Sequence, residues 1–317
     1  MIMSSLKEIK SRIASVKNTL KITSAMKMVA SAKLHKAQAA IGGKLPYEQQ
    51  LHRILAGLLQ DDDLLSAMRH ELGFSNPDGQ SAIILEDVGV DQIPSKDKCP
   101  RIALVAFSSN SSLCGSFNVN AIKKYHETLR LLEGNGFAKD DIDTYVIGRK
   151  MAEAVRKSGY PVKSDLSDLA DKPSYDAAFD LASELVDSFT SGEVSHVLLV
   201  YNHFASPGSQ PSVRENYLPL SLHDIDKGDR YDQPIDYILE PDPLSLVKSL
   251  LPQVLLLKLY TVMLDANAAE HAARTLAMQI ASDNAQDLIA ELTLAYNKGR
   301  QQEITAEILD LVGGTMA

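Results

Sequence analysis

The stretch LKEIKSRIASVKNTLKITSAMKMVASAKL, which runs from Leu6 to Leu34, decides the fold of this chain of 317 residues. Apolar or small side chains recur in it and just beyond it, mostly at steps of three and four residues: Leu6, Ile9, Ile13, Val16, Leu20, Thr23, Ala30, Leu34, Ala37 and Ile41. Such steps place one continuous apolar stripe on a helix, as in a coiled coil. The sequence therefore predicts a long N-terminal helix that needs a partner helix.

Two glycines and a proline interrupt this stripe. Gly42, Gly43 and Pro46 predict a kink, because proline removes a backbone donor and its ring clashes with the preceding turn. Leucines then resume the helical pattern, so we expect a shaft helix over residues 1–60 with a length of roughly 80 Å. Residues 61–100, which contain acidic and Gly/Pro-containing patches, predict an irregular connection.

A second long helix is predicted at the other end of the chain, over residues 244–317. From Pro252 to Val312 the composition favours helix and is broken only by Gly299, which gives a length of about 90 Å. Its stripe is predicted at Met278, Ala281, Ala285, Leu288, Leu292, Ala295, Ile304, Ile308 and Leu311. A helix this long must pack on a partner of similar length or protrude. We therefore expect the two terminal helices to pair antiparallel as one shaft.

The middle of the chain has a different pattern, which predicts an inserted Rossmann-like α/β domain over residues 101–243. Short apolar runs at 102–107, 145–147 and 197–201 alternate with helical patterns near 119–132, 150–158 and 175–189. Strands that alternate with helices form parallel sheets with right-handed crossovers. Residues 213–220 and 237–240 predict further strands that pair antiparallel at an edge.

The net charge of −9 is unevenly distributed. Residues 1–44 contain nine lysines and arginines and a single acid, Glu8. Three interpretations of this basic arm remain open on charge alone: a stripe that binds nucleic acid, a helix on a membrane surface, or an import presequence. Its lysines point to many sides of the helix, which suits a rod enclosed by acidic walls.

Membrane spans and disulfides are not indicated by the composition. The most apolar stretch, residues 244–264, contains Lys248, Lys258 and Pro252, so we predict no transmembrane segment. Cys99 and Cys114 form no C-x-x-C pair and have no histidine cluster beside them, which favours two reduced thiols and no metal site.

A serine-rich turn, residues 108–116, follows one predicted strand and precedes a helix, where α/β proteins often bind phosphate. Neither a Walker A motif nor G-x-G-x-x-G is present. Cys114 has only His126 nearby in sequence, and a small cysteine at a turn is more often buried than nucleophilic. We predict a packed turn without catalysis, cofactor or direct nucleotide binding.

Two polar features of the C-terminal helix have both a structural and a functional interpretation. Glu270 and Arg274 form an i,i+4 pair, although Arg274 can instead reach outward. Residues 297–303 are polar through nearly two turns. This heptad is either a solvated face or a polar collar that turns inside another protein, with hydrogen bonds from Arg300 and Gln301.

Both ends of the chain resemble the gamma subunits of F-type rotary ATP synthases. The segments that carry the resemblance are residues 6–13, 21–34, 270–274, 282–285, 291–298 and 300–308, followed by Gly313 and Gly314. In the middle, residues 113–118 are similar to the family's Cys-Gly-Gly turn. Ser116 replaces a glycine there, and Asn110 and Ser111 replace an acidic-basic pair. The closely spaced regulatory cysteines of chloroplast members are absent from the sequence.

The resemblance implies a non-catalytic rotor shaft of a proton-translocating ATP synthase, which couples rotation of the membrane c-ring to ATP synthesis and hydrolysis. Its partners would be three alpha and three beta subunits, the epsilon subunit and the c-ring. It places the chain at the cytoplasmic face of a bacterial inner membrane. Contact residues carried over by the resemblance are Met26, Lys27 and Arg274, level with acidic levers of the beta subunits, and Arg300, Gln301 and Thr305, an upper catch.

Two other functions are compatible with parts of the sequence. A basic coiled-coil adaptor for nucleic acid or a membrane surface predicts binding that depends steeply on salt, and the acidic remainder of the chain disfavours it. An α/β nucleotide-binding enzyme predicts stoichiometric nucleotide binding by the isolated chain, and the missing phosphate loop disfavours it.

Overall fold

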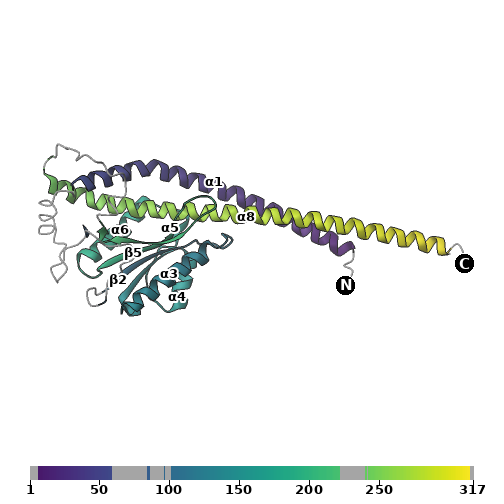
Figure 1. The fold of residues 1–317 in the computed structure, drawn as a ribbon, viewed down its shortest axis with the longest axis horizontal. Coiled ribbons are helices and arrows are strands. Elements are labelled where there is room, and N and C mark those ends of the chain that lie inside the picture. Colours follow the sequence, from purple (N-terminus) through teal and green to yellow (C-terminus); the bar gives the residue numbers. More distant parts are fainter. Residues whose placement is uncertain are drawn as a thin grey trace. The chain divides into compact units, whose positions relative to one another are not determined.

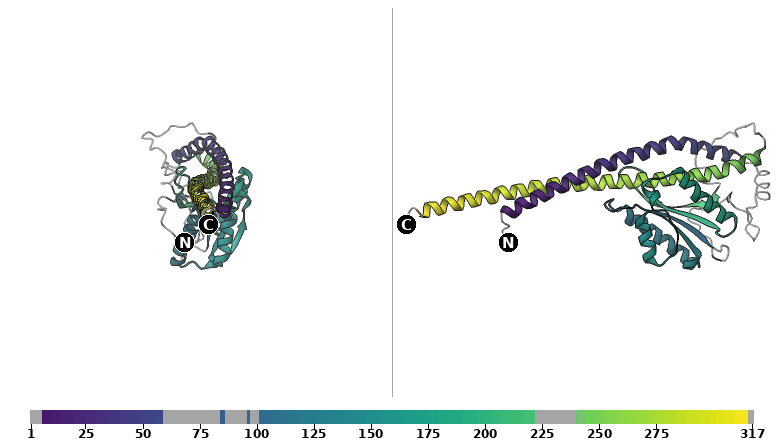
Figure 2. Two further views of the ribbon diagram at one scale, coloured as in Figure 1. Left: turned by 90° about the vertical axis from the view of Figure 1, so that its right-hand side faces the viewer. Right: turned by 180° about the vertical axis from the view of Figure 1, so that it is seen from behind.

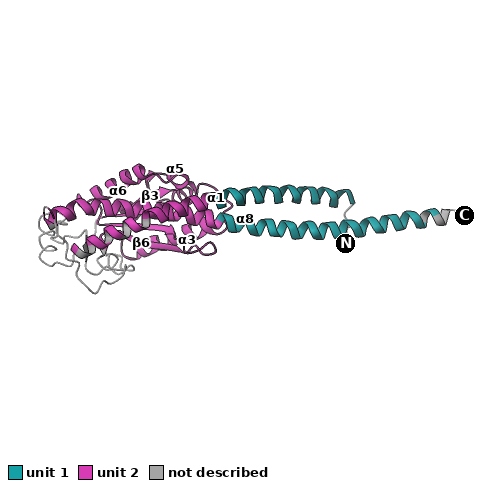
Figure 3. Cartoon of the chain, turned by 90° about the horizontal axis from the view of Figure 1, so that it is seen from above, with its two compact units in different colours: residues 1–32, 274–317 teal, residues 33–273 magenta. Residues whose placement is uncertain are grey.

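The computed structural model of the chain describes residues 6–58, 84–85, 96, 101–221, 240 and 242–314 (Figure 1). Contacts divide the chain into two compact units, which Figure 3 distinguishes by colour. Unit 1 comprises residues 1–32 and 274–317, and unit 2 comprises residues 33–273. Residues 237–239 of the strand predicted at 237–240, and most of the predicted connection, lie outside the described residues.

Two long helices, α1 (Leu6–Leu58) and α8 (Pro243–Gly314), contribute to both units. Each contains a proline, Pro46 in α1 and Pro252 in α8. The helix continues beyond Pro46 to Leu58, as predicted, and the kink expected at Pro46 stays a prediction. Beyond Pro46, Leu55 is fully buried in the core of unit 2, and such burial offsets the hydrogen bond that proline removes.

Unit 2 contains a five-stranded sheet with the order β4-β3-β2-β5-β6. Its strands are β2 (Ile102–Phe107), β3 (Ile142–Ile147), β4 (Val162–Asp165), β5 (His196–Asn202) and β6 (Ser212–Leu218). All neighbours are parallel except β6, which runs antiparallel to β5 at one edge. The predicted parallel sheet and its antiparallel edge are confirmed. A two-residue strand, β1 (Ile84–Leu85), pairs in parallel with β7 (Leu220–Ser221).

The helices of unit 2 follow the predicted alternation. They are α3 (Phe117–Gly134), α4 (Arg149–Ser158), α5 (Asp168–Asp171) and α6 (Tyr175–Thr190), with a 3-10 turn, η2 (Lys139–Asp141). The sequence did not predict β4 or α5. β4 is the edge strand Val-Lys-Ser-Asp, whose side chains alternate between exposed and partly exposed, so it lacks the apolar run by which a buried strand is found.

Each face of this sheet has its own core. Ile102, Leu104 and Ala106 of β2 face α3 and α4, while Ala103, Val105 and Phe107 face the other side. That second side is covered by α6 and by the first half of α8, as Figures 1 and 2 show, and the end of α1 packs into the same hydrophobic core. Unit 2 is thus a three-layer α/β structure in which both terminal helices supply part of one layer.

The first half of α8 is unusually apolar because it is a core helix of unit 2. Among the described residues, α8 is the one helix with an 18-residue window apolar enough for a membrane span, with a mean hydropathy of 1.4. Of that window, 56% is buried inside the protein, and core helices pass the same test. The absence of a transmembrane segment stays a prediction.

Polar contacts tie the edge of the sheet to α8. The Tyr217 hydroxyl donates to the Leu255 carbonyl at 3.0 Å, and the Lys258 ammonium lies 2.9 Å from the Glu215 carboxylate. Tyr201 also donates to Glu215, at 2.9 Å. Because the buried Lys258 pairs with Glu215 and also donates to the Asn216 carbonyl at 3.4 Å, its charge is tolerated in the core.

Gly148, which links β3 to α4, has no space for a side chain. Its φ is +112°, and a Cβ built there would lie 2.2 Å from the Ser108 carbonyl oxygen. Gly148→Ala should therefore lower the free energy of unfolding by roughly 2–4 kcal/mol in urea titrations. The matched control is Gly134→Ala, because a Cβ there meets nothing within 4 Å. Its effect should stay below about 1 kcal/mol, and equal losses at both positions would contradict the steric argument.

His196, at the start of β5, generates a second prediction. Burial lowers the pKa of His196 to about 4, from 6.5 in the unfolded chain. Between these pH values the unfolded state binds a proton that the folded state does not. The free energy of unfolding therefore has its full value above about pH 6.5 and decreases as the pH falls towards 4. Relative to His196→Leu, the wild-type chain should lose up to about 1.4 kcal/mol per pH unit between pH 6.5 and pH 5. Equal pH dependence of the two unfolding free energies would refute this.

Candidate functional site

The paired helices of unit 1 form the candidate site. The Thr23 and Ser282 side-chain oxygens lie 2.9 Å apart, and a Cβ on Gly299 would lie 2.9 Å from Cδ2 of Leu6. Leu6 and Thr23 are separated by as many residues as Ser282 and Gly299. One step forward along α1 therefore matches one step back along α8. The predicted antiparallel pairing of the two terminal helices is confirmed.

The stripe of α1 is the one that the sequence predicts. Within unit 1, Leu6, Ile9, Ile13, Val16 and Leu20 are partly buried between exposed neighbours, and Thr23 and Ala30 are fully buried. Lys27, midway between the last two, is also partly buried and completes the repeat. A lysine can occupy such a position because its long aliphatic stem covers apolar surface while its charge stays in water.

The stripe of α8 is only partly the predicted one. Its buried or partly buried members alternate by four and three residues: Met278, Ser282, Ala285, Ile289, Leu292, Tyr296 and Gly299. The predicted Leu288 is 43% exposed and Ala295 is exposed, so both predictions were wrong. The predicted Ile304, Ile308 and Leu311 are also exposed, at 45%, 55% and 72%, and were wrong too. Ser282 was passed over because it is polar. It is buried here because Thr23 supplies its hydrogen-bond partner.

The structure places the predicted contact residues in unit 1. Met26, Lys27 and Arg274 are partly buried. Arg300, Gln301 and Thr305 are exposed on the last part of α8, where the Thr305 hydroxyl donates to the Gln301 carbonyl at 2.8 Å. The register sets Lys27 level with Met278, and Arg274 level with Ser31 on the next turn of α1.

The outer surface of unit 1 combines positive charge with exposed apolar side chains. The exposed lysines of α1 include Lys7, Lys10, Lys17 and Lys21, and Glu8 pairs with Arg12 at 3.1 Å. Beside them, Ile22, Met28 and Val29 are each more than half exposed. Sequence reasoning did not single out these three, although their position off the stripe was the available signal. Exposed apolar groups beside charges are typical of a surface that contacts other proteins.

The serine-rich turn is held by hydrogen bonds to the side chain of Asn118 in α3. Ser109 donates its backbone N–H to the Asn118 amide oxygen at 3.0 Å, and the Asn118 amide nitrogen donates to Ser109 Oγ at 2.8 Å. The same nitrogen lies 3.2 Å from the buried Cys114 sulfur. Polar groups that could face a phosphate are therefore engaged within the turn, and Cys114 is packed against Phe117 and α8.

Asn110, one of the departures from the family's turn, joins three elements. Its amide oxygen accepts the Arg149 backbone N–H at 3.0 Å. Its amide nitrogen donates to the Ser167 carbonyl at 2.8 Å and to the Asp171 carboxylate at 2.7 Å. The replacement thus fastens the start of α4 and the short helix α5 to the end of β2.

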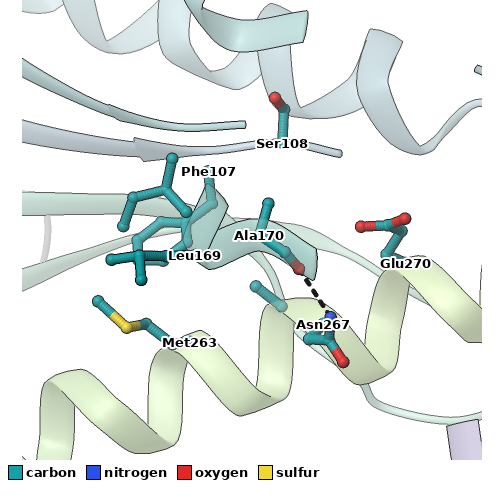
Figure 4. A pocket seen from close by; sticks show the side chains of 9 residues that line it. Phe107, Ser108, Leu169, Ala170, Met263, Asn267 and Glu270 are labelled. Carbon is teal, nitrogen blue, oxygen red and sulfur yellow. Dashed lines mark hydrogen bonds between the residues drawn. The ribbon is translucent and has the colours of Figure 1, made fainter. Parts of the chain in front are cut away.

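A small pocket lies at the carboxyl ends of β2 and β3 (Figure 4). Asn267 of α8 closes one side and donates to the Ala170 carbonyl at 2.8 Å, while buried Glu270 closes another. The pocket has room for about one water molecule, whereas small-molecule sites measure roughly 300 Å³ or more. Among the described residues no cluster of three metal-ligating side chains occurs.

Comparison with known proteins agrees with this architecture. A family model described as ATP synthase matches residues 5–317. The ATP synthase gamma chain of Phocaeicola vulgatus is 48% identical over 315 residues, which are 99% of this chain and 100% of that relative. The gamma chain of Flavobacterium psychrophilum is 36% identical over 318 residues, or 99% of each chain.

Solved structures share the fold. A chain from the OSCP/F1/c-ring structure of Euglena gracilis mitochondrial ATP synthase matches with a TM-score of 0.61 at 18% identity, covering 98% of this chain and 94% of that one. A chain from the central stalk and c-ring of Tetrahymena thermophila mitochondrial ATP synthase matches with a TM-score of 0.54 at 19% identity, covering 82% and 99%. With full-length relatives up to 48% identical, the chain belongs to the ATP synthase gamma chain family.

Proposed function

We propose that this chain is the central rotor shaft of a proton-translocating F-type ATP synthase. It couples rotation of a membrane c-ring to ATP synthesis and hydrolysis in a head of three alpha and three beta subunits, and it is not itself catalytic. The observation that carries the proposal is the antiparallel helix pair of unit 1, in a chain whose relatives are gamma chains along their whole length.

The proposed roles of the segments follow the limits predicted from the sequence. Residues 1–60 and 244–317 form the shaft, residues 61–100 connect, and residues 101–243 form an α/β domain that binds the epsilon subunit and the c-ring. The positions of β2, which begins at Ile102, and of α8, which begins at Pro243, support these limits.

Coupling requires that the shaft contact the beta subunits unequally. An asymmetric rod gives the three subunits different conformational free energies, so that one site favours tight binding while another favours release. An almost complete shift between two states needs about 5.5 kcal/mol of differential interaction. Single hydrogen bonds do not supply this, whereas the many exposed lysines and apolar side chains of unit 1 together can.

The proposed contacts are at two levels. Met26, Lys27 and Arg274 meet acidic levers of the beta subunits, where the two cations lie about one helical turn apart in the observed register. Arg300, Gln301 and Thr305 form the upper catch, whose exposure leaves their polar groups accessible to a partner. Directional hydrogen bonds there can be made and broken as the shaft turns.

The relatives are gamma chains of bacterial ATP synthases, complexes that associate with membranes. We place the chain accordingly in a membrane-associated complex, and more narrowly at the cytoplasmic face of the inner membrane as a peripheral subunit. Its functions there are ATP synthesis and hydrogen ion transport.

Co-expression with alpha and beta subunits tests the proposal. The chain should copurify with them as an asymmetric assembly, and ATP turnover should depend on its presence. A chain that stays separate and leaves turnover unchanged would refute the assignment. Steeply salt-dependent DNA binding by the chain in place of assembly would support the adaptor function instead.

The catch is tested by changing Arg300 and Gln301 together to Ala. Because both side chains are exposed, folding should be preserved, while protons pumped per ATP hydrolysed should fall at least two-fold in reconstituted vesicles. The matched control changes Lys298 and Gln302 to Ala, which removes a cation and an amide from the same exposed turns. Unchanged pumping in the first variant, or an equal loss in the control, would contradict the assignment.

A further inference from the structure

Hydroxyl groups meet in the middle of the apolar contact of unit 1. The described residues that are fully buried in unit 1 are Ala30, Met278, Ala285, Thr23 and Ser282. Thr23 is 8% exposed and Ser282 is 6% exposed. Two of the most buried positions in the pair are therefore polar, at a place where apolar side chains would pack at lower cost.

The two hydroxyls form an ordered chain of hydrogen bonds. Thr23 Oγ1 donates to the Leu20 carbonyl of its own helix at 3.1 Å. Its proton is thereby used, so Ser282 Oγ donates across the interface to Thr23 Oγ1 at 2.9 Å. The Ser282 donor thus bonds to a residue of the other helix, and this interhelical bond forms only in an arrangement that sets these two positions side by side.

We infer that the Thr23–Ser282 hydrogen bond selects the register of the two helices and so positions Lys27 and Arg274 relative to one another. A buried polar residue in a coiled coil specifies register in this way, at some cost in stability. The part of this inference that concerns coupling rests on the proposed function, whereas the part that concerns register does not.

Slipped registers show what the hydrogen bond discriminates against. A slip by one heptad keeps the stripes facing one another but moves Ser282 opposite Val16 or opposite Ala30. Neither apolar side chain can accept its proton, so a slipped arrangement loses the interhelical hydrogen bond and leaves Ser282 to donate only to a carbonyl of its own helix. One of the two slips does return a hydroxyl neighbour to Thr23, namely Thr275, but neither returns one to Ser282.

The contact at the other end of the pair supports the same register. Gly299 has no side chain, and its Cα lies where Leu6 packs, so that a Cβ would come within 2.9 Å of Leu6 Cδ2. A slip of one heptad moves Leu6 opposite Leu292 or Ala306, where a side chain occupies that space. Two separate contacts therefore favour one alignment.

Slippage would matter because charges move with the register. A slip of one heptad shifts one helix along the other by about 10 Å, or nearly two turns. Lys27 and Arg274, now about one turn apart, would then present a different pattern to any partner. The hydroxyl pair keeps the two positive charges at a constant spacing while the shaft is under load.

Spin-label distances in the purified full-length chain test the register directly. Nitroxide labels would be attached through Ser11→Cys and Asn284→Cys, two exposed positions about 15 Å apart along the axis, in a background with Cys99→Ser and Cys114→Ala. The wild-type pair should give one distance. Thr23→Val with Ser282→Ala, which removes both hydroxyls, should add a second population shifted by about 10 Å along the axis.

Two control variants define the outcome. Exchanging the residues, Thr23→Ser with Ser282→Thr, keeps a hydroxyl pair and should keep the single distance. Thr19→Val with Thr293→Val removes two hydroxyls that bond only to carbonyls of their own helices, and should also keep it. A single distance in the double apolar variant, or a shift in either control, would overturn the inference.

Coupling is measured separately, in membrane vesicles that contain the complete complex with its alpha and beta subunits and its c-ring. The double apolar variant should lower protons pumped per ATP at least two-fold relative to the Thr19/Thr293 control, and unchanged pumping would overturn the claim for coupling. Should the double variant lose helix content, Ser282→Ala alone replaces it, since Thr23 then keeps its bond to Leu20. Failure of the chain to assemble would refute the proposed function and leave the distance test intact.

Discussion

The two long helices each carry an apolar stripe along their length, which must be buried against another element. The rest of this structure depends on that requirement. Neither α1 nor α8 could bury its stripe alone. In unit 1 each is the other's partner, with Thr23 beside Ser282 and Leu6 beside Gly299. In unit 2 the same two helices, through Leu55 and the leucines of α8, cover one face of the sheet. The helices at the two ends of the chain therefore form part of the hydrophobic core of its middle domain.

The composition of α8 changes along its length to meet these two environments. Its first half, which includes Val247, Val254 and Leu259, is buried against a β-sheet and is rich in large aliphatic residues. Ala268, Ala269 and Ala272 follow, and small side chains allow close packing there. Beyond residue 300 its described side chains are exposed. One helix thus serves as core, as half of a coiled coil and as an accessible surface.

The sequence predicted those parts of the fold that depend on local periodicity. The α1 stripe was correct over residues 6–20 because each of its members there has a polar residue on at least one side, whereas Ile22 and Val29 are apolar residues that lie off the stripe. The α8 stripe was shifted because alanines flank it, and because Ser282 becomes a buried residue only once Thr23 is known to face it. Edge strand β4 was not predicted because its side chains alternate between exposed and partly exposed, so it has no apolar run. The positions of Met26, Lys27 and Arg274 came from the family resemblance, and neither the lysine's place in the stripe nor exposed Val29 was predicted.

The Asn118 amide has a consequence for anion binding at the turn between β2 and α3. Its oxygen accepts the Ser109 backbone N–H at a strand-to-helix turn, a position where other α/β proteins present such donors to phosphate. A tethered acceptor competes with free anions at a very high effective concentration. One backbone donor of the turn is therefore already occupied by a side chain of the same chain, which a free anion would have to displace.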